Sequence, residues 1–261
     1  MLPSERRRRL LARLDEEGPL AVPDLSAELR VSPATVRRDL RALASAGRLR
    51  RVRGGALPAR SDMAVAEPLY EEKLRRHTGE KAAIAREAVR RLRDGDVVAM
   101  DSGSTTGALA AEMRRFEDLT IITTDLKIAL MLADEPTFDV IVVGGSVRTG
   151  LYSLVGPLAE RALVDLGAHI AFIGADAIDV GKGVTNASLA EVAVKRALLR
   201  CARTGVLLAD HGKFDRVSLA EVAPLSGFHE VITDAGIAAD TASRYRAAGA
   251  NLTLAHLEDR T

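Results

Sequence analysis

Cysteine is almost absent from this chain of 261 residues, and its five histidines are scattered without the spacing of metal ligands. A single cysteine, Cys201, excludes an intramolecular disulfide framework and is typical of the reducing cytosol, so we expect a cytoplasmic protein. Because Cys201 ends an apolar-faced helical segment, we expect a buried, inert thiol. We expect neither a structural metal nor a cofactor.

Long hydrophobic runs are missing as well, although 47% of the residues are hydrophobic. Charged residues break the apolar runs well before 18 residues, so we expect no membrane-spanning helix. Residues 1–9 are charged but are not followed by an uninterrupted apolar region, which argues against a secretory signal. The length and the apolar content suffice for a module of about 60 residues and a second domain of ordinary size.

Lysine is absent from residues 1–60, which contain 14 arginines against 7 acidic residues and so carry a net charge of +7. The remainder holds 23 basic and 29 acidic residues, a net charge of −6. Such an asymmetry between two parts of one chain predicts an N-terminal part that binds nucleic acid and a C-terminal part with another task.

The stretch from Ser32 to Ala46 is typical of a capped amphipathic helix. The hydroxyl of Ser32 can cap the helix, and Pro33 suits its first position. An apolar stripe with helical spacing follows at Val36, Leu40 and Leu43. The opposite face presents four residues: Ala34, Arg37, Arg38 and Arg41. A helix that packs by one stripe and exposes arginines on the other suits the major groove of DNA.

Two further helical segments precede this one, at Ser4–Glu17 and Pro23–Leu29, and a basic hairpin follows at residues 48–55. Three short helices and a hairpin are typical of a winged helix-turn-helix domain, whose wing reaches phosphate or the minor groove. The wing arginines are Arg50, Arg51 and Arg53. The alternative is a small helical module with a solvated charged face, but the coincidence of cap, stripe, arginines and wing favours DNA binding.

Residues 58–78 lack periodicity and are expected to link a DNA-binding domain at 1–57 to a second domain at 79–261. A helix at residues 80–93 opens the second domain, and apolar runs then alternate with amphipathic helices. This alternation predicts an α/β domain whose parallel sheet is covered on both faces. The expected strands are Val97–Met100, Leu119–Thr123, Phe138–Val143, His169–Gly174, Gly205–Ala209, Glu230–Thr233 and Leu252–Ala255. Expected helices between them include Thr106–Arg115, Leu189–Cys201 and Ala238–Ala247.

Ligands of such sheets bind at the carboxyl ends of the strands, where four loops carry polar groups. The loop Met100–Gly107 follows a strand and opens a helix, and its glycines, hydroxyls and free N–H groups suit a phosphate. An ordinary capped helix start explains this loop equally well. The other loops offer acids for sugar hydroxyls and a lysine for phosphate, and their joint placement favours a binding site. They are residues 123–125 with Thr124, residues 174–176 and 182–186 with Glu191, and residues 210–214.

Nine short motifs occur in order along the chain. They are V-S-P-A-T-V-R-R-D-L, R-V-R-G-G-A, E-P-L-Y-E-E-K, G-E-K-A-A-I-A, D-S-G-S-T-T, I-I-T-T-D, V-V-G-G, F-I-G-A-D and A-D-H-G-K-F. Over nearly its whole length the chain thereby resembles the DeoR-type bacterial transcriptional regulators. The resemblance implies a repressor of a carbohydrate-metabolism operon, with a sensor domain similar to sugar-phosphate isomerases such as ribose-5-phosphate isomerase. It also implies release from DNA by a phosphorylated sugar or related metabolite.

The resemblance further implies which residues contact this effector. Residues around the phosphate would be Asp101, Ser102, Gly103, Ser104, Thr105 and Thr106. Residues that contact or sense the rest of the sugar would be Asp176, Glu191, Asp210 and Lys213, with Lys81 and Thr124 as further candidates.

Two other classes of function compete with a metabolite-controlled regulator. Related sugar-phosphate isomerases carry a D-G-A-D-E stretch whose acids move a proton, whereas residues 173–177 read I-G-A-D-A and keep only Asp176. We therefore expect binding without turnover and not an enzyme. A DNA binder that ignores metabolites is the other class, and the loops at 101–106 and 210–213 argue against it.

For DNA recognition we expect a homo-oligomer, at least a dimer, with two copies of the helix at 32–46 in major grooves of double-stranded operator DNA. Arg37, Arg38 and Arg41 would contact phosphates and guanine, and Thr35 would touch a thymine methyl group. The wing arginines would add sequence-independent affinity. Asp39 is expected to orient a neighbouring arginine.

Overall fold

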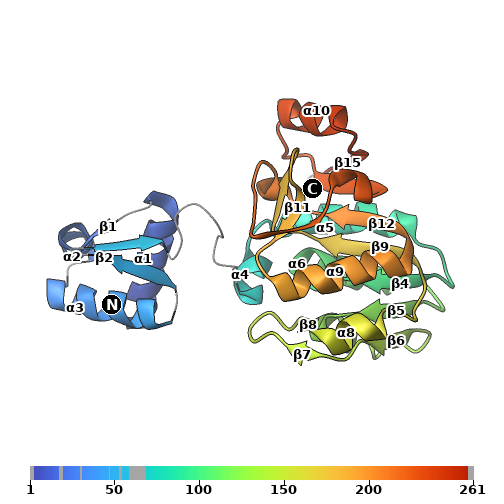
Figure 1. Ribbon diagram of the computed structural model, residues 1–261, viewed down its shortest axis with the longest axis horizontal. Coiled ribbons are helices and arrows are strands. Elements are labelled where there is room, and N and C mark those ends of the chain that lie inside the picture. Colours follow the sequence, from blue (N-terminus) through green and yellow to red (C-terminus); the bar gives the residue numbers. More distant parts are fainter. Residues whose placement is uncertain are drawn as a thin grey trace. The chain divides into compact units, whose positions relative to one another are not determined.

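The computed structural model of this chain divides into two compact units, Met1–Glu67 (unit 1) and Pro68–Thr261 (unit 2), whose elements are labelled in Figure 1. The structure describes residues 3–17, 20–29, 31–46, 48–52, 55–58 and 69–257. Within these ranges, every helix is too short or too polar to cross a membrane.

Unit 1 combines three helices with a small antiparallel sheet of strand order β1-β3-β2. Its elements are α1 (Pro3–Glu17), β1 (Leu20–Ala21), α2 (Val22–Leu29), α3 (Pro33–Ser45), β2 (Leu49–Val52) and β3 (Gly55–Pro58). Glycine is required at position 55, because a Cβ atom there would overlap the carbonyl oxygen of Leu20 in β1. The three helices agree with the sequence prediction. The hairpin forms as predicted but extends to Pro58, beyond the predicted residues 48–55, and the two-residue strand β1 was not predicted.

One apolar core joins the three helices of unit 1 to its sheet. Leu10 and Leu14 from α1, Leu25 from α2, and Val36 and Leu40 from α3 are each at most 1% exposed. Each such side chain contributes about 1.5–3 kcal/mol through burial. Each of the three helices therefore packs into this core through one apolar stripe.

Unit 2 is built on a seven-stranded parallel sheet in the order β15-β14-β12-β9-β4-β5-β6. The strands are β4 (Val97–Met100), β5 (Thr120–Thr123), β6 (Asp139–Val142), β9 (Ala168–Gly174), β12 (Ala202–Leu208), β14 (Glu230–Asp234) and β15 (Leu252–Ala255). All seven strands expected from the apolar runs are present with small shifts at their ends. The predicted fold class, an α/β domain preceded by a winged helix-turn-helix domain, is therefore confirmed.

Helices cover both faces of this sheet (Figure 1). On one face, α5 (Thr78–Ala88), α6 (Ser104–Met113) and α7 (Leu126–Leu132) pack against strand residues such as Val98 and Phe172. On the other face, α8 (Pro157–Ala162) and α9 (Leu189–Cys201) pack against Ala99 and Ile173. Double coverage explains why the strands read as continuous apolar runs.

The stretch expected as a linker, residues 58–78, needs a correction at its C-terminal end. A short helix, α4 (Tyr70–Arg75), forms there and packs on α6. Tyr70 is 5% exposed, and a Cβ atom at Gly107 would lie 3.0 Å from its hydroxyl oxygen. Six residues are too few to show helical periodicity, so this docking was not visible in the sequence. Residues 59–68 lie outside the described ranges.

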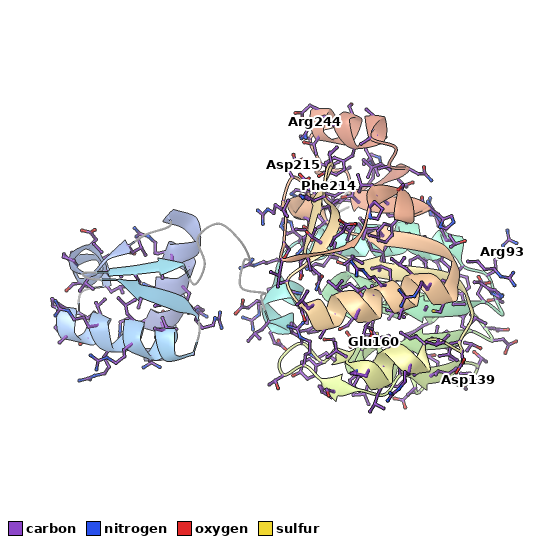
Figure 2. The ribbon with its side chains drawn as sticks, viewed as in Figure 1. Arg93, Asp139, Glu160, Phe214, Asp215 and Arg244 are labelled. Carbon is purple, nitrogen blue, oxygen red and sulfur yellow. The ribbon has the colours of Figure 1, made fainter. Side chains whose placement is uncertain are left out.

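Smaller elements complete unit 2. A second, antiparallel sheet has the order β10-β11-β13, and β7 pairs with β8. The C-terminal helix α10 (Ala239–Ala247) is held by Tyr245, whose hydroxyl donates to the carbonyl of Ile178 at 2.9 Å. Arg244 pairs with Asp215 at 2.6 Å beside Phe214 (Figure 2). These short strands are β7 (Ser146–Val147), β8 (Leu154–Val155), β10 (Ala177–Asp179), β11 (Gly183–Asn186) and β13 (Ala220–Ala223).

Candidate functional sites

The helix α3 begins and packs as its sequence predicts. Ser32 has extended backbone angles (φ −64°, ψ 151°), and its hydroxyl accepts a hydrogen bond from the N–H of Thr35 at 3.2 Å. Val36 and Leu40 of the apolar stripe are buried, as is Leu43. This burial leaves the opposite side of α3 open to solvent.

Three arginines dominate that open side. Arg37, Arg38 and Arg41 are exposed, and within the described residues none has a hydrogen-bond or ion-pair partner. Ser32 and Ala34 are exposed too, while Thr35 is partly buried. Free guanidinium groups on one helix face suit phosphate oxygens and guanine edges.

Asp39 lies on the inner side of α3, where it is 1% exposed. Its Oδ2 and Oδ1 accept hydrogen bonds from the Nε atoms of Arg6 at 2.5 Å and Arg7 at 2.9 Å, both from α1. Burial alone would raise the pKa of Asp39, but the hydrogen bonds and charges of Arg6 and Arg7 outweigh it and lower the pKa. Arg6 and Arg7, which are part of the basic charge of unit 1, therefore link α1 to α3 through Asp39.

The wing is described mainly through its backbone. Arg50 and Arg51 belong to β2, but their side chains lie outside the described residues, as does the whole of Arg53. The DNA contacts expected of these three arginines stay predictions.

In unit 2 the strand order changes direction between β4 and β9. Ligands of doubly wound sheets bind beyond the carboxyl ends of the strands at such a point. Asp101, directly after β4, accepts the N–H of Gly174, at the end of β9, at 2.9 Å. The loops singled out in the sequence therefore meet at one edge of the sheet.

The loop after β4 is closed onto Asp125. The hydroxyl of Ser102 donates to Oδ2 of Asp125 at 2.7 Å, and the N–H of Gly103 donates to the same atom at 3.2 Å. The other oxygen of Asp125 caps α7 by accepting the N–H groups of Lys127 and Ile128. Burial nevertheless raises the pKa of Asp125. Two donors of the expected phosphate cradle are thus engaged by a carboxylate of the protein.

The first turn of α6 retains further donors. The hydroxyls of Ser104 and Thr105 have no hydrogen-bond partner within the described residues, whereas that of Thr106 donates to the carbonyl of Gly103 at 3.0 Å. The N-terminus of a helix attracts anions through its free N–H groups and its dipole. Thr124, at the end of the neighbouring strand, is 1% exposed.

Asp101 forms a buried ion pair with Lys195 of α9. The two residues are 3% and 4% exposed, and Lys195 also donates to the carbonyl of Gly174 at 3.1 Å. Burial would lower the pKa of Lys195, but the carboxylates of Asp101 and Glu191 outweigh it and raise the pKa. The ammonium group is therefore charged, and it neutralises Asp101 at the centre of the site.

Asp176, after β9, is likewise paired. Its Oδ1 lies 3.2 Å from Nζ of Lys73 in α4, and its Oδ2 accepts the N–H of Ala187 at 3.0 Å. Burial would raise the pKa of Asp176, but these two partners and the charges of nearby lysines lower it. The helix α4 thus contributes a cation to the site.

Glu191, in the first turn of α9, accepts three side-chain partners. The hydroxyl of Ser153 donates to it at 2.7 Å and the amide of Asn186 at 2.8 Å, and Arg148 forms an ion pair with it. Burial would raise the pKa of Glu191, but the charges of Lys195 and Arg148 lower it. The carboxylate is consequently ionised and held in place.

Lys213 differs from the other lysines of the site. It lies in the turn η2 (His211–Lys213), is partly buried, and has no hydrogen-bond or ion-pair partner among the residues described. Burial lowers the pKa of Lys213 against the opposing charges of Asp210 and Asp176. Asp210 itself is 2% exposed and accepts the N–H of Gly212 at 3.1 Å. A free ammonium group here suits a phosphate.

Lys81 is more deeply buried, at 5% exposure, and donates to the carbonyl oxygens of Lys73 and Arg76. Burial lowers the pKa of Lys81 to about 8. These contacts hold the turn between α4 and α5 in place. Lys81 therefore stabilises the backbone next to the site.

Comparison with known families assigns both units. Residues 6–61 match the DeoR-like helix-turn-helix domain, and residues 76–235 match the DeoR C terminal sensor domain. The chain belongs to the DeoR family of transcriptional regulators. The resemblance inferred from the nine motifs is confirmed.

Relatives of this DeoR-family chain align with it over most of both lengths. The HTH-type transcriptional regulator GolR of Listeria innocua is 32% identical over 98% of this chain and 100% of the relative. The regulator GlpR of Haloferax volcanii is 34% identical over 95% of this chain and 96% of its own. The glycerol-3-phosphate regulon repressor of Haemophilus influenzae is 30% identical, covering 89% and 90%.

Among solved structures, ribose 5 phosphate isomerase A from Neisseria gonorrhoeae is similar at 17% identity and a TM-score of 0.39, over 53% of each chain. The similarity concerns the arrangement of strands and helices.

Sequence reasoning missed three cations of this DeoR-family sensor domain: Lys73, Arg148 and Lys195. Lys195 lies one helical turn after Glu191, so the shared helix face was a usable signal. Lys73 and Arg148 belong to segments that only tertiary packing brings to the sheet edge.

A cavity of the DeoR-family sensor domain opens at the other edge of the sheet. Its lining includes Arg91, His169, His229 and Glu230. Nε of Arg91 donates to Glu230 at 2.9 Å, and its NH1 donates to Glu87 at 2.7 Å. Arg91 of this cavity is therefore engaged by two carboxylates of the protein.

Proposed function

We propose that this protein represses a carbohydrate-metabolism operon and that a phosphorylated sugar or related metabolite releases it from operator DNA. The observation that carries the proposal is the unpartnered ammonium group of Lys213 at the same sheet edge as the N-terminus of α6. The name of one relative, the glycerol-3-phosphate regulon repressor, supports both the repression and the phosphorylated metabolite.

The phosphate is placed at the first turn of α6, where Ser104 and Thr105 have free hydroxyls. To reach the donors of Ser102 and Gly103, it must displace the carboxylate of Asp125. The sugar hydroxyls then face Asp176 and Glu191, whose carboxylates are ionised and held in place, and the buried side chain of Asp210. Lys81 and Thr124 line the same region as supporting residues.

On DNA, the proposed unit is a homo-oligomer, at least a dimer, that inserts two copies of α3 into major grooves. The effector acts by changing the arrangement of the two units through the chain between residues 58 and 68. It can do so only by binding one arrangement more tightly than the other.

The test is a fluorescence-anisotropy titration of full-length protein against the DNA upstream of its own gene, with and without a panel of sugar phosphates. We expect tight, salt-sensitive binding that one compound releases. The variant Lys213→Ala should bind DNA equally well but require about tenfold more of that compound, as expected for loss of one charged contact worth about 1.4 kcal/mol. The matched control is Arg200→Ala, which removes an exposed cation from the last turn of α9.

Two other outcomes separate the competing classes of function. DNA binding that no sugar phosphate disturbs at millimolar concentration would leave the DNA-binding unit intact and reject the sensor. Catalytic interconversion of an aldose or ketose phosphate above background would favour an enzyme. Neither I-G-A-D-A at 173–177 nor the paired state of Asp176 supports that second outcome.

A further inference from the structure

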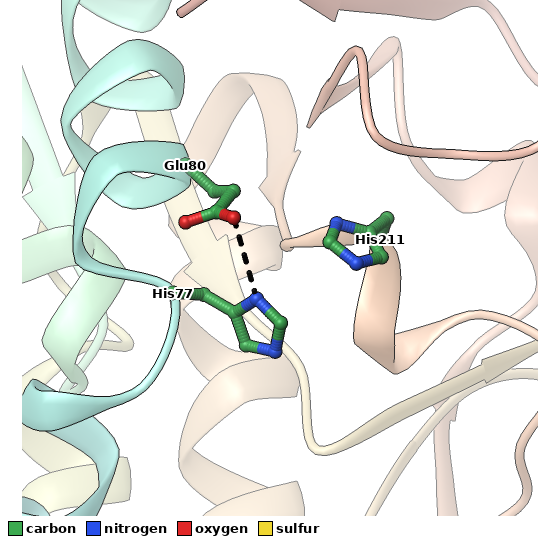
Figure 3. A group of neighbouring side chains, drawn as sticks. All are labelled: His77, Glu80 and His211. Atoms are coloured by element: carbon green, nitrogen blue, oxygen red, sulfur yellow. Dashed lines mark ion pairs between the residues drawn. The ribbon is translucent and has the colours of Figure 1, made fainter.

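Two histidines that are far apart in the sequence meet beside the candidate effector site. His77, directly before α5, and His211, in η2, have ring centroids 4.9 Å apart with an interplanar angle of 86°. Glu80, in the first turn of α5, lies 3.6 Å from Nδ1 of His77. One ligand atom from each of the three side chains lies within 4.8 Å of the other two. Figure 3 shows the three side chains converging between the start of α5 and η2.

A buried aspartate stands behind each imidazole. Nδ1 of His211 is 2.7 Å from Oδ2 of Asp234, which is fully buried, and Nε2 of His77 is 3.9 Å from Oδ1 of Asp210. A carboxylate beside one ring nitrogen holds a proton there and leaves the other nitrogen with a free lone pair. Nε2 of His211 is consequently free to bind a metal, and Nδ1 of His77 faces the carboxylate of Glu80, which is the third ligand group.

Two glycines give the rings the room they need. A Cβ atom at Gly236 would lie 2.9 Å from Nδ1 of His211, between that ring and Asp234. A Cβ atom at Gly212 would lie 3.3 Å from Nε2 of His77. Side chains at these positions would push the imidazoles away from their aspartates.

We propose that His77, Glu80 and His211 bind a divalent transition-metal ion of the zinc class. Two imidazoles and one carboxylate form a donor set that Zn²⁺ accepts, with a fourth position open to water, whereas Mg²⁺ prefers oxygen ligands. Zinc–ligand bonds of about 2.0–2.2 Å place ligand atoms about 3.3 Å apart, so the three side chains must move together slightly. Their exposed fractions of 37%, 25% and 32% permit that adjustment.

Such an ion would clamp the start of α5 to η2, and therefore to Lys213. The histidine spacing in the sequence predicted no metal, because the two ligating segments are separated by most of the parallel sheet. Only the packing of α5 on β14 and β15 unites them. The site does not depend on the proposed sugar-phosphate effector, since metal binding is measured without effector or DNA.

The test uses full-length protein stripped of metal with EDTA and titrated with Zn²⁺, with Co²⁺ as an optical probe and Mg²⁺ as the negative control. We expect one Zn²⁺ per chain and a rise in Tm of about 5 °C at a hundred times the Kd. His211→Gln and Glu80→Gln should each weaken Zn²⁺ binding about 100-fold or more and change the Co²⁺ spectrum. The matched control is His169→Gln, because His169 also lies beside a carboxylate, Asp96 at 3.0 Å, at the opposite edge of the sheet.

Circular dichroism of each metal-free variant establishes that it is folded before titration. Equal Zn²⁺ affinity in wild type, His211→Gln and Glu80→Gln would place the ion elsewhere and overturn the proposal. A wild-type protein that binds neither Zn²⁺ nor Co²⁺ at millimolar concentration would overturn it as well.

Discussion

The arginines of α3 and two paired lysines of the sensor domain, Lys73 and Lys195, use positive charge in opposite ways. Arg37, Arg38 and Arg41 are exposed and lack partners in the described part of the chain. Lys195 is buried against Asp101, and Lys73 pairs with Asp176. An exposed, unpaired cation can bind a polyanion without rearrangement. A paired cation can bind a ligand only after its ion pair with a carboxylate of the protein is broken. The first arrangement suits DNA, and the second suits discrimination between small molecules.

The largest effect is expected where a paired cation is removed. Lys195→Met leaves Asp101 buried without a counter-charge and should destabilise unit 2 by about 3–5 kcal/mol. Urea denaturation followed by circular dichroism measures the loss. The double variant Lys195→Met/Asp101→Asn should recover a large part of it, because no buried charge then remains unpaired. A loss below about 1 kcal/mol would show that the pair is solvated, contrary to its burial.

A pH-dependent effect of similar size is expected at Lys81. Burial lowers the pKa of Lys81 to about 8 in the folded protein, below the value of about 10.4 in the unfolded chain. Between these two values the unfolded state binds more protons, so the free energy of unfolding should rise with pH, by up to about 3 kcal/mol. Lys81→Met should lack this rise. Denaturation at pH 7, 8.5 and 10 compares the two slopes, and equal slopes would contradict the assignment.

Removal of an unpartnered cation should leave stability alone and act on DNA. Arg38→Ala should weaken operator binding by about 1–3 kcal/mol and reduce the salt slope by about one counterion if the contact is to phosphate. Anisotropy at several salt concentrations measures both quantities. Arg93→Ala is the control, because Arg93 is an exposed arginine of unit 2 (Figure 2). Reduced effector binding in Arg38→Ala would argue against separate roles for the two units.

The smallest effect is expected at the start of α3. Ser32→Ala removes the hydroxyl that accepts the N–H of Thr35 and should cost about 1 kcal/mol of stability in unit 1. Ser32→Asn, which retains a capping oxygen, should restore most of it. Thermal unfolding followed by circular dichroism compares the three proteins. An unchanged Tm in Ser32→Ala would show that Pro33 and packing alone define this helix end.

Most of the fold could be predicted from local sequence patterns. The cap at Ser32, the stripe of Val36 and Leu40, and the seven apolar strands are each encoded within a few neighbouring residues. The helix α4 was missed because Tyr70–Arg75 is too short to show a period, and its docking depends on the space that Gly107 leaves.

The candidate site was predictable as a set of loops, because parallel strands bring their carboxyl ends to one edge. Its internal pairing was not predictable. That Lys195 neutralises Asp101, or that Asp125 occupies the donors of Ser102 and Gly103, follows from side chains that meet only after the sheet has formed. Sequence patterns identify such residues, but they do not show which of them already form hydrogen bonds or ion pairs within the protein.

The order of the two units along the chain also has a consequence for protein synthesis. Unit 1 has its own core, and its last strand ends at Pro58, whereas the sheet edge of unit 2 is incomplete until β12 and Lys213 have been made. At about 5–20 residues per second, a ribosome needs roughly 8–30 s to extend the chain from one point to the other. During that interval each nascent chain contains the whole sequence of unit 1 but not the completed sheet edge of unit 2. Under the proposed function, the DNA-binding unit of each chain is therefore complete before its effector site is.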